Sequence, residues 1–232
     1  MDRRTFHRLC GGLIGSASLL HRELAASESA DASADGPTPP QPRSRLVRGD
    51  ETPLTIGDVH PGQAWVFHYP YRTTPCFLIG LDEPAPGGLG EGASVVAFSA
   101  ICSHKMSHPA RPISHIGYRA EPVEFVDRDG VRQRRTGTIS CCSERSVYDP
   151  GDGGRVLAGP APTPLAAIRL ALDPDDTIVA TASLGPNRYD DFLDAFGFRL
   201  AMEHGQSDVR RLSGKTCEAT PAGEYSRQQI RC

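Results

Sequence analysis

The chain has 232 residues and a formal net charge of −3 at pH 7. No apolar run approaches the roughly 20 residues that cross a bilayer, and no long basic block is present, so neither a membrane span nor a nucleic-acid partner is expected. Its 24 glycines and 20 prolines, about a fifth of all residues, separate short apolar segments. This favours a loop-rich, mostly β protein over a helical bundle. The seven cysteines predict disulfides or a metal site.

The N-terminus has the features of an export signal. Arg3 and Arg4 precede an apolar stretch from Leu9 to Leu20, which has the length of a signal-peptide core, and Ala32-Ser33-Ala34 offers a cleavage site. The pattern resembles a twin-arginine signal. We therefore predict a signal peptide over residues 1–34, a periplasmic location and no transmembrane anchor after cleavage. An amphipathic N-terminal segment and an uncleaved anchor are the alternatives.

A linker and a β domain are expected next. Residues 35–45 are rich in Pro and Arg and lack the apolar content to fold, so we predict a linker there. Over residues 46–185, short apolar runs alternate with turn residues, which is typical of an antiparallel β protein. Strands are expected at 64–67, 76–79, 94–98, 123–126, 131–139, 166–172 and 177–182. Turn sequences follow the strands at 123–126 and 166–172, and each predicts a hairpin with the next strand.

Residues 186–232 are predicted to form a helix and a polar tail. Apolar residues at helical spacing indicate a helix over Tyr189–Met202, although Gly197 weakens this prediction. Cys217 and Cys232 lie in the tail, and a disulfide between them would hold the tail to the domain; free thiols are the alternative. Cys76 lies in a predicted apolar strand and is expected to be a small buried side chain.

Cysteine and histidine are concentrated in two segments. The first contains Cys102-Ser103-His104, and the second begins with Cys141-Cys142. The second segment continues through Ser146, Tyr148, Asp149, Gly153-Gly154 and Gly159-Pro160-Ala161-Pro162. Structural zinc sites usually show paired Cys-x₂₋₄-Cys and His-x₃₋₅-His spacings, and this pattern fits them poorly.

This ordered set resembles a Rieske iron–sulfur domain, over about residues 94–172. The resemblance implies a β-sandwich whose loops hold a [2Fe–2S] cluster, with Cys102, His104 and Cys141 as ligands. It also implies that the hydroxyls of Ser146 and Tyr148 donate hydrogen bonds to cluster and cysteine sulfur. The loop at Gly159 and Pro160 would shield the cluster from water.

Three departures from the family pattern affect the expected site. Glu144 occupies the position of the second histidine, so the fourth ligand could be Glu144, Cys142, His108 or His115. Ser107 and Ser143 occupy the positions of a disulfide that joins the two loops in respiratory members. The separation between His104 and Cys141 is about twice the usual length, which a surface hairpin can absorb at little cost. An anionic fourth ligand would favour the oxidised cluster, so we expect a low, weakly pH-dependent potential.

The expected function is one-electron transfer by a periplasmic protein, either a free carrier or the small subunit of a larger oxidoreductase. No catalysis by the chain itself is expected, and too few residues follow the domain for an oxygenase domain. A cluster-free interaction module on the same scaffold is the alternative, and a zinc site is a third. Arg132, Arg134 and Arg135 form either a solvated face or a docking patch for an acidic redox partner.

Overall fold

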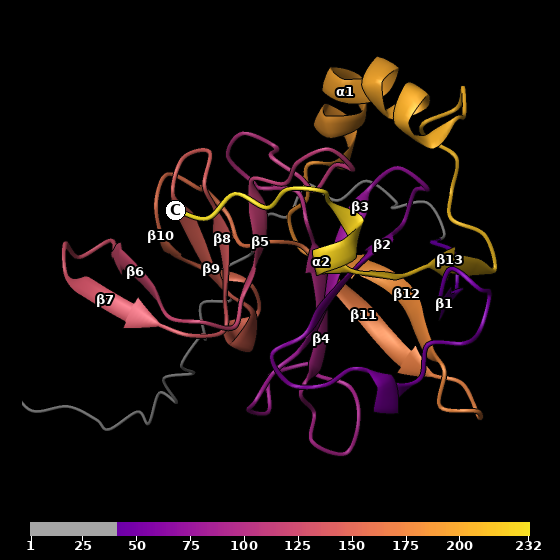
Figure 1. Cartoon of the computed structure of the whole chain (residues 1–232), viewed down its shortest axis with the longest axis horizontal. Helices are drawn as coiled ribbons and strands as arrows, with labels where there is room; N and C mark the ends of the chain where they lie inside the picture. The colour runs from indigo at the N-terminus through magenta and orange to yellow at the C-terminus, as the bar shows by residue number, and fades with distance from the viewer. Residues whose placement is uncertain (1–40) are drawn as a thin grey trace, which may run out of the picture. The chain divides into compact units, whose positions relative to one another are not determined.

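The structure is a computed structural model that describes residues 41–232 (Figure 1). The predicted signal peptide at 1–34 and most of the predicted linker at 35–45 lie outside the described residues. The described part is mostly β, with two sheets, a separate hairpin and two helices, so the predicted fold class is confirmed. Neither helix in this part of the chain is long and apolar enough to span a membrane.

The larger sheet has eight strands in the order β13-β1-β12-β11-β4-β3-β2-β14. All of its neighbouring strands are antiparallel except β1 and β13. Its strands, in chain order, are β1 (Ser44–Val47), β2 (Ala64–His68), β3 (Pro75–Gly80), β4 (Val95–Ser99), β11 (Ala167–Leu172), β12 (Ile178–Leu184), β13 (Thr216–Glu218) and β14 (Thr220–Pro221). Strand β1 begins inside the predicted linker, whose last residues are therefore part of the folded domain.

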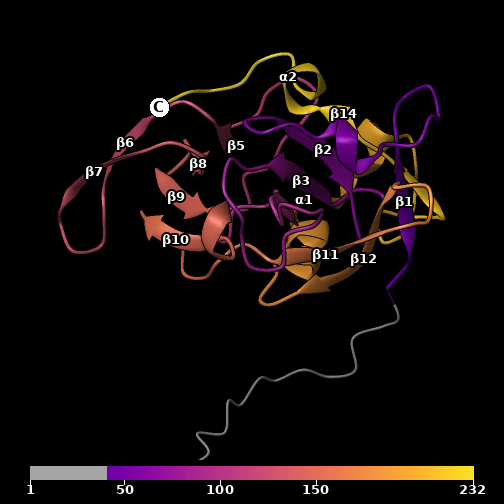
Figure 2. The ribbon, with the colours of Figure 1, turned by 90° about the horizontal axis from the view of Figure 1, so that it is seen from below.

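The smaller sheet has four antiparallel strands in the order β10-β9-β8-β5, and β6 and β7 form a hairpin beside it (Figures 1 and 2). These strands are β5 (Ile116–Arg119), β6 (Val123–Val126), β7 (Arg132–Arg135), β8 (Thr138–Cys141), β9 (Ser146–Asp149) and β10 (Arg155–Ala158). The single strand predicted at 131–139 is wrong, because the chain turns at Gly137 (φ 67°): β7 pairs with β6 in the hairpin, and β8 pairs with β5 in the smaller sheet. Gly130 (φ 79°) forms the turn of the hairpin, as predicted.

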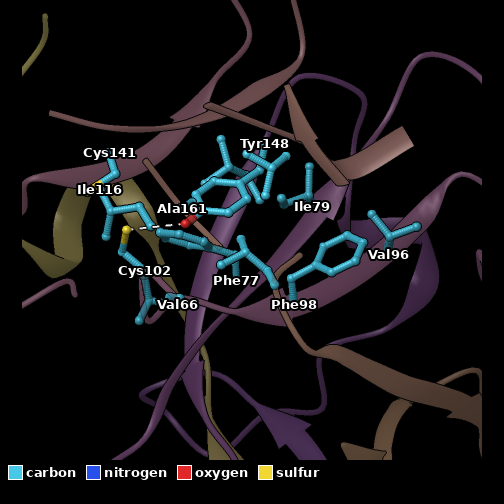
Figure 3. Close-up of a cluster of buried hydrophobic side chains, with 14 of the residues drawn as sticks. Val66, Phe77, Ile79, Val96, Phe98, Cys102, Ile116, Cys141, Tyr148 and Ala161 are labelled. Carbon is cyan, nitrogen blue, oxygen red and sulfur yellow. Dashed lines mark hydrogen bonds between the residues drawn. The ribbon is translucent and has the colours of Figure 1, made fainter. Parts of the chain in front are cut away.

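The two sheets share one hydrophobic core. Phe77 and Ile79 of β3 and Phe98 of β4 belong to the same buried cluster as Ile139 of β8 and Tyr148 of β9 (Figure 3). Side chains on the other face of the large sheet form a second cluster, in which Cys76 is fully buried. The predicted role of Cys76 as a buried side chain is therefore confirmed. The shared core holds β8 and β9 against the large sheet. These strands flank the second cysteine loop, which runs from Cys141 to Ser146.

Helix α1 (Tyr189–His204) packs on the first cysteine loop. Its buried side chains Phe192, Leu193 and Leu200 contact a cluster that includes Ile101, the residue before Cys102. The predicted helix is confirmed and extends two residues further, to a left-handed C-cap at Gly205. Because α1 buries this apolar face against the loop, the helix helps to position Cys102.

The C-terminal tail belongs to the folded domain. It supplies β13 and β14 to the edges of the large sheet, then forms α2 (Ala222–Tyr225) and a strap over residues 226–232. The predicted Cys217–Cys232 disulfide is wrong: Cys217 is a buried free thiol beside β1, and Cys232 bonds to Cys142. The strap carries the C-terminus away from Cys217 to the smaller sheet, where both views place it (Figures 1 and 2).

Candidate metal centre

Cys102 and Cys141 meet in the core, although 38 positions of sequence separate them. Cys102 follows β4, Cys141 ends β8, and both lie on the same side of the core cluster (Figure 3). Their exposed fractions are 0% and 1%. The Cys141 thiol donates a hydrogen bond to Cys102, which lowers the pKa of Cys102 to about 5 even though burial acts in the opposite direction. The same contact raises the pKa of Cys141. A cysteine binds a metal as its thiolate, so a contact that lowers the pKa of Cys102 favours the form that binds iron.

Tyr148 is positioned to donate a hydrogen bond to sulfur. Its hydroxyl lies 3.2 Å from the Sγ of Cys102, and the backbone N–H of Ser103 donates to the same oxygen at 3.2 Å. Burial raises the pKa of Tyr148 well above its usual range, so the phenol keeps its proton. Because the oxygen already accepts from Ser103, its O–H is available to the Cys102 thiolate. This is the contact that the sequence resemblance implies.

Within residues 41–232, two buried polar atoms near these cysteines have no hydrogen-bond partner. They are Nδ1 of His104 and Oγ of Ser146. Buried polar atoms are nearly always paired, because leaving one unpaired costs about 1–3 kcal/mol. Both atoms belong to residues that the resemblance places against a cluster, one as an iron ligand and one as a donor to sulfur. The groups present therefore fit three ligands and two hydrogen-bond donors of a Rieske-type centre.

Two close contacts hold the loops around this site. The Ser107 hydroxyl donates to the Ser143 hydroxyl at 2.7 Å, so the residues at the positions of the family disulfide are joined by a hydrogen bond. At Gly159 (φ 82°), an added Cβ would lie 2.5 Å from the carbonyl oxygen of Arg145 and 2.7 Å from the Cα of Ser146. Gly159 begins the proline-rich loop, Gly159-Pro160-Ala161-Pro162. Only glycine at this position allows the loop to approach the second cysteine loop this closely.

The structure removes two of the four candidates for the fourth ligand. Cys142 is bonded to Cys232, so it has no thiolate to offer, and its prediction as a ligand is wrong. His108 uses both ring nitrogens elsewhere: Nδ1 donates to the Met106 carbonyl at 2.8 Å, and Nε2 accepts from Arg199. Its ring also packs edge-on against Phe192 of α1.

Glu144 and His115 remain as candidates for the fourth ligand. Both side chains are exposed. Glu144 lies in the second cysteine loop, and His115 lies beside that loop, because the backbone N–H of Cys142 donates to the His115 carbonyl at 2.6 Å. Within residues 41–232, no three His, Cys, Asp or Glu side chains gather tightly enough to hold a single metal ion. A two-iron centre does not require such a group, because each iron takes only two protein ligands.

Both cysteine loops contain a non-glycine residue in the left-handed region: Met106 (φ 55°) and Arg145 (φ 57°). This conformation costs roughly 1–2 kcal/mol for a residue with a Cβ. Arg145→Gly is expected to raise the free energy of unfolding by about 0.5–1 kcal/mol, after the greater freedom of glycine in the unfolded chain is subtracted. Urea denaturation measures the change. Arg145→Ala is the matched control, because it removes the same side chain and keeps the strain; equal stability of the two variants would contradict the prediction.

The predicted basic face on the hairpin is partly neutralised. Arg135 forms an ion pair with Asp149 at 3.0 Å, and Arg134 lies 4.0 Å from Glu124. Arg132 forms no ion pair with any described residue and lines a cavity of about 530 Å³ between the hairpin and the smaller sheet. This arrangement supports a solvated face more than a concentrated docking patch.

Comparison with known proteins does not assign the chain to a family. No protein-family model matches the chain. The structure is similar to the soluble domain of the Rieske protein II (soxF) from Sulfolobus acidocaldarius, with a TM-score of 0.44, 26% identity, and coverage of 63% of this chain and 80% of that one. It is also similar to the ferredoxin of carbazole 1,9a-dioxygenase from Nocardioides aromaticivorans IC177, with a TM-score of 0.34, 19% identity, and coverage of 56% and 93%.

Proposed function

We propose that the protein is a one-electron carrier with a Rieske-type [2Fe–2S] cluster. The observation that carries the proposal is the convergence of chemically matched groups: two buried cysteine sulfurs, and the unpartnered Nδ1 of His104 and Oγ of Ser146. Cys102 and Cys141 would hold one iron, and His104 would hold the other together with Glu144 or His115. The bound cluster supplies reversible one-electron oxidation and reduction.

The chain's own residues would bind, orient and shield the centre. The Tyr148 hydroxyl donates to Cys102, and such a bond withdraws charge from sulfur and stabilises the reduced state. The Ser103 hydroxyl donates to the Thr163 carbonyl at 2.8 Å, which joins the first loop to the proline-rich loop. Ala161 of that loop is 1% exposed and lies in the core cluster with both cysteines, so it excludes water from their sulfurs.

Metal analysis of the purified protein tests this function. The chain is purified without air, and iron and acid-labile sulfide are measured together with the electron paramagnetic resonance spectrum of the reduced form. About two irons and two sulfides per chain, the content of a [2Fe–2S] cluster, are expected. A folded, colourless and iron-free protein would instead support a cluster-free interaction module. Stoichiometric zinc without sulfide would support a zinc site.

The fourth ligand controls the reduction potential. Glu144→His replaces a carboxylate with a neutral imidazole, which removes one negative charge beside the iron. We expect the potential to rise by on the order of 100 mV or more, because clusters with two histidines lie well above those with only anionic ligands. A redox titration measures the shift, with Glu144→Gln as the control for loss of charge alone. An unchanged potential in both variants would exclude Glu144, and loss of the cluster in His115→Ala would then identify His115.

We also propose that the protein is exported in a folded form to the periplasm. The paired Arg3 and Arg4 support this location, as does the Cys142–Cys232 disulfide, because disulfides persist in oxidising compartments. Arg3→Lys with Arg4→Lys keeps the charge of the segment and removes the paired arginines. Cell fractionation is expected to find the native chain in the periplasm and the double variant in the cytoplasm. Equal periplasmic amounts of the two would contradict the proposal.

A further inference from the structure

A cavity of about 240 Å³ opens between the first cysteine loop and α1. Its lining includes Lys105, which follows the candidate ligand His104, and Arg199 of α1. The lining contains histidines but neither aspartate nor glutamate. The cavity is therefore cationic, and it lies directly beside the candidate metal centre.

Among the residues that the structure describes, Arg199 is held in place without an acidic partner. Its guanidinium donates to Nε2 of His108 and lies over the Phe196 ring, 4.9 Å from the centroid. His108 is a neutral acceptor here: burial lowers its pKa to about 4, and its Nδ1 proton is donated to Met106. The positive charge of Arg199 is therefore oriented by its neighbours but not neutralised by them.

Two further arginines extend this charge. The backbone N–H of Arg111 donates to the Glu203 carboxylate of α1 at 2.9 Å, and the N–H of Arg227 donates to the Arg111 carbonyl at 2.9 Å. We define the basic face as Lys105, Arg111, Arg199 and Arg227. Among the described residues, none of these four side chains forms an ion pair within 4.0 Å.

Several other arginines of the described chain form ion pairs with acidic side chains. Arg43, Arg155 and Arg210 are examples, each paired with a neighbouring aspartate. The basic face instead carries four cations without an ion pair among the described residues, in a chain whose net charge is negative. Uncompensated like charges repel one another, and bound carboxylates from outside the chain would relieve that repulsion.

Exposed apolar side chains stand beside the basic face on α1. Phe198 and Met202 are 85% and 73% exposed, and their i, i+4 spacing places them on one side of the helix. Protein interfaces commonly combine aromatic and methionine side chains with arginine, whereas a free inorganic anion would gain nothing from them. The two features together favour a protein partner over a small ion.

We infer that the basic face and the neighbouring Phe198 and Met202 form the docking site for an acidic, partly apolar surface of a protein partner. That this partner exchanges electrons with the chain rests on the proposed function, because Lys105 lies next to His104. A partner seated here would bring its own redox centre towards the candidate metal centre. Attraction between opposite charges would speed the encounter and weaken as the salt concentration rises.

Binding of labelled acidic peptides tests the site without requiring a cluster. The probes are a fluorescein-labelled decaglutamate and a peptide of the same length with two leucines in place of two glutamates. Fluorescence anisotropy at low ionic strength is expected to show threefold to fivefold weaker binding of both probes to Lys105→Gln and to Arg199→Gln. Phe198→Ser is expected to weaken only the leucine-containing probe. Arg169→Gln is the matched control, since Arg169 is an exposed arginine on β11 outside the basic face.

Several results would overturn the docking site. One is that the basic-face variants bind the peptides as tightly as the native chain does, and another is that the native chain does not bind them. A third is that sulfate displaces the peptide much more effectively than chloride does at the same ionic strength. Binding of phosphatidylglycerol vesicles in place of the peptides would also overturn it. An iron-free chain whose binding depends on Lys105 and Arg199 would refute the proposed electron transfer and leave the docking site standing. An iron-containing chain whose peptide binding is unchanged in both variants would refute the docking site and leave the proposed electron transfer standing.

Discussion

Cys102→Ala is expected to abolish iron and sulfide binding completely, from about two irons per chain to none. Cys102 is fully buried, its Sγ lies 3.2 Å from the Tyr148 hydroxyl, and it shares a core cluster with Cys141. The other free cysteines of the described chain belong to a different cluster, so neither can take its place. A lost thiolate leaves one iron with a single protein ligand, and such a cluster does not persist. Iron analysis and the visible absorption spectrum measure the result.

A matched control separates loss of the ligand from loss of the fold. Cys217→Ala removes another buried free thiol, which lies beside β1 and away from the candidate centre. This variant is expected to keep its iron. When both variants are compared in the iron-free form, their losses of stability are expected to be comparable, because each change removes one buried sulfur atom. If the Cys102 variant retains two irons, or if both variants lose them, the assignment of Cys102 as a ligand is wrong.

Individual helices and turns could be predicted from the sequence because the residues that determine each of them lie close together along the chain. The helix over Tyr189–His204 follows from apolar spacing, and the turn of the β6–β7 hairpin follows from Gly130, whose φ of 79° few other residues adopt easily. The break between β7 and β8 was missed because Gly137 is a weak signal within an otherwise continuous strand pattern. Pairing of β8 with β5, rather than with β6, depends on the shared core and leaves no trace in local periodicity.

The candidate site was predictable where residue type and order carry its chemistry. The order of residues along the chain is enough to identify the candidates Cys102, His104, Cys141, Ser146 and Tyr148. The partner of Cys142 was not predictable, because it lies 90 residues away at the end of a strap with no apolar pattern. Cysteine parity allows many pairings, and only the path of the strap beside β5 selects this one.

That path shows how the C-terminus supports the second cysteine loop. The N–H of Ser114 donates to the Gln228 carbonyl at 2.8 Å, the N–H of Ile230 donates to the Ser114 carbonyl at 2.8 Å, and Arg119 donates to the Ile230 carbonyl at 2.5 Å. The strap therefore pairs with the chain at Ser114, just before β5, and is held again by the side chain of Arg119 at the end of β5. Its final residue is bonded to Cys142, the neighbour of Cys141.

Removing this disulfide is expected to destabilise the domain by about 4–5 kcal/mol. The bond closes a loop across 90 residues of sequence, and restriction of the unfolded chain increases with loop length. For a domain of this size, a loss of that order lowers the melting temperature by about 10 °C or more. Urea denaturation and thermal melting of Cys142→Ala with Cys232→Ala, compared with the native chain, measure the change.

Reductant supplies the internal control for that experiment. Dithiothreitol is expected to lower the urea midpoint of the native chain to that of the double variant and to leave the double variant unchanged. The effect should also reach the neighbouring site, because a freed strap no longer holds Cys142, and Cys141 then depends on β8 and the Ser107–Ser143 hydrogen bond alone. When a chelator is added, iron is therefore expected to leave the chain with the reduced disulfide faster than the chain in which the disulfide is intact. Identical midpoints with and without reductant would mean that the Cys142–Cys232 bond does not form in solution.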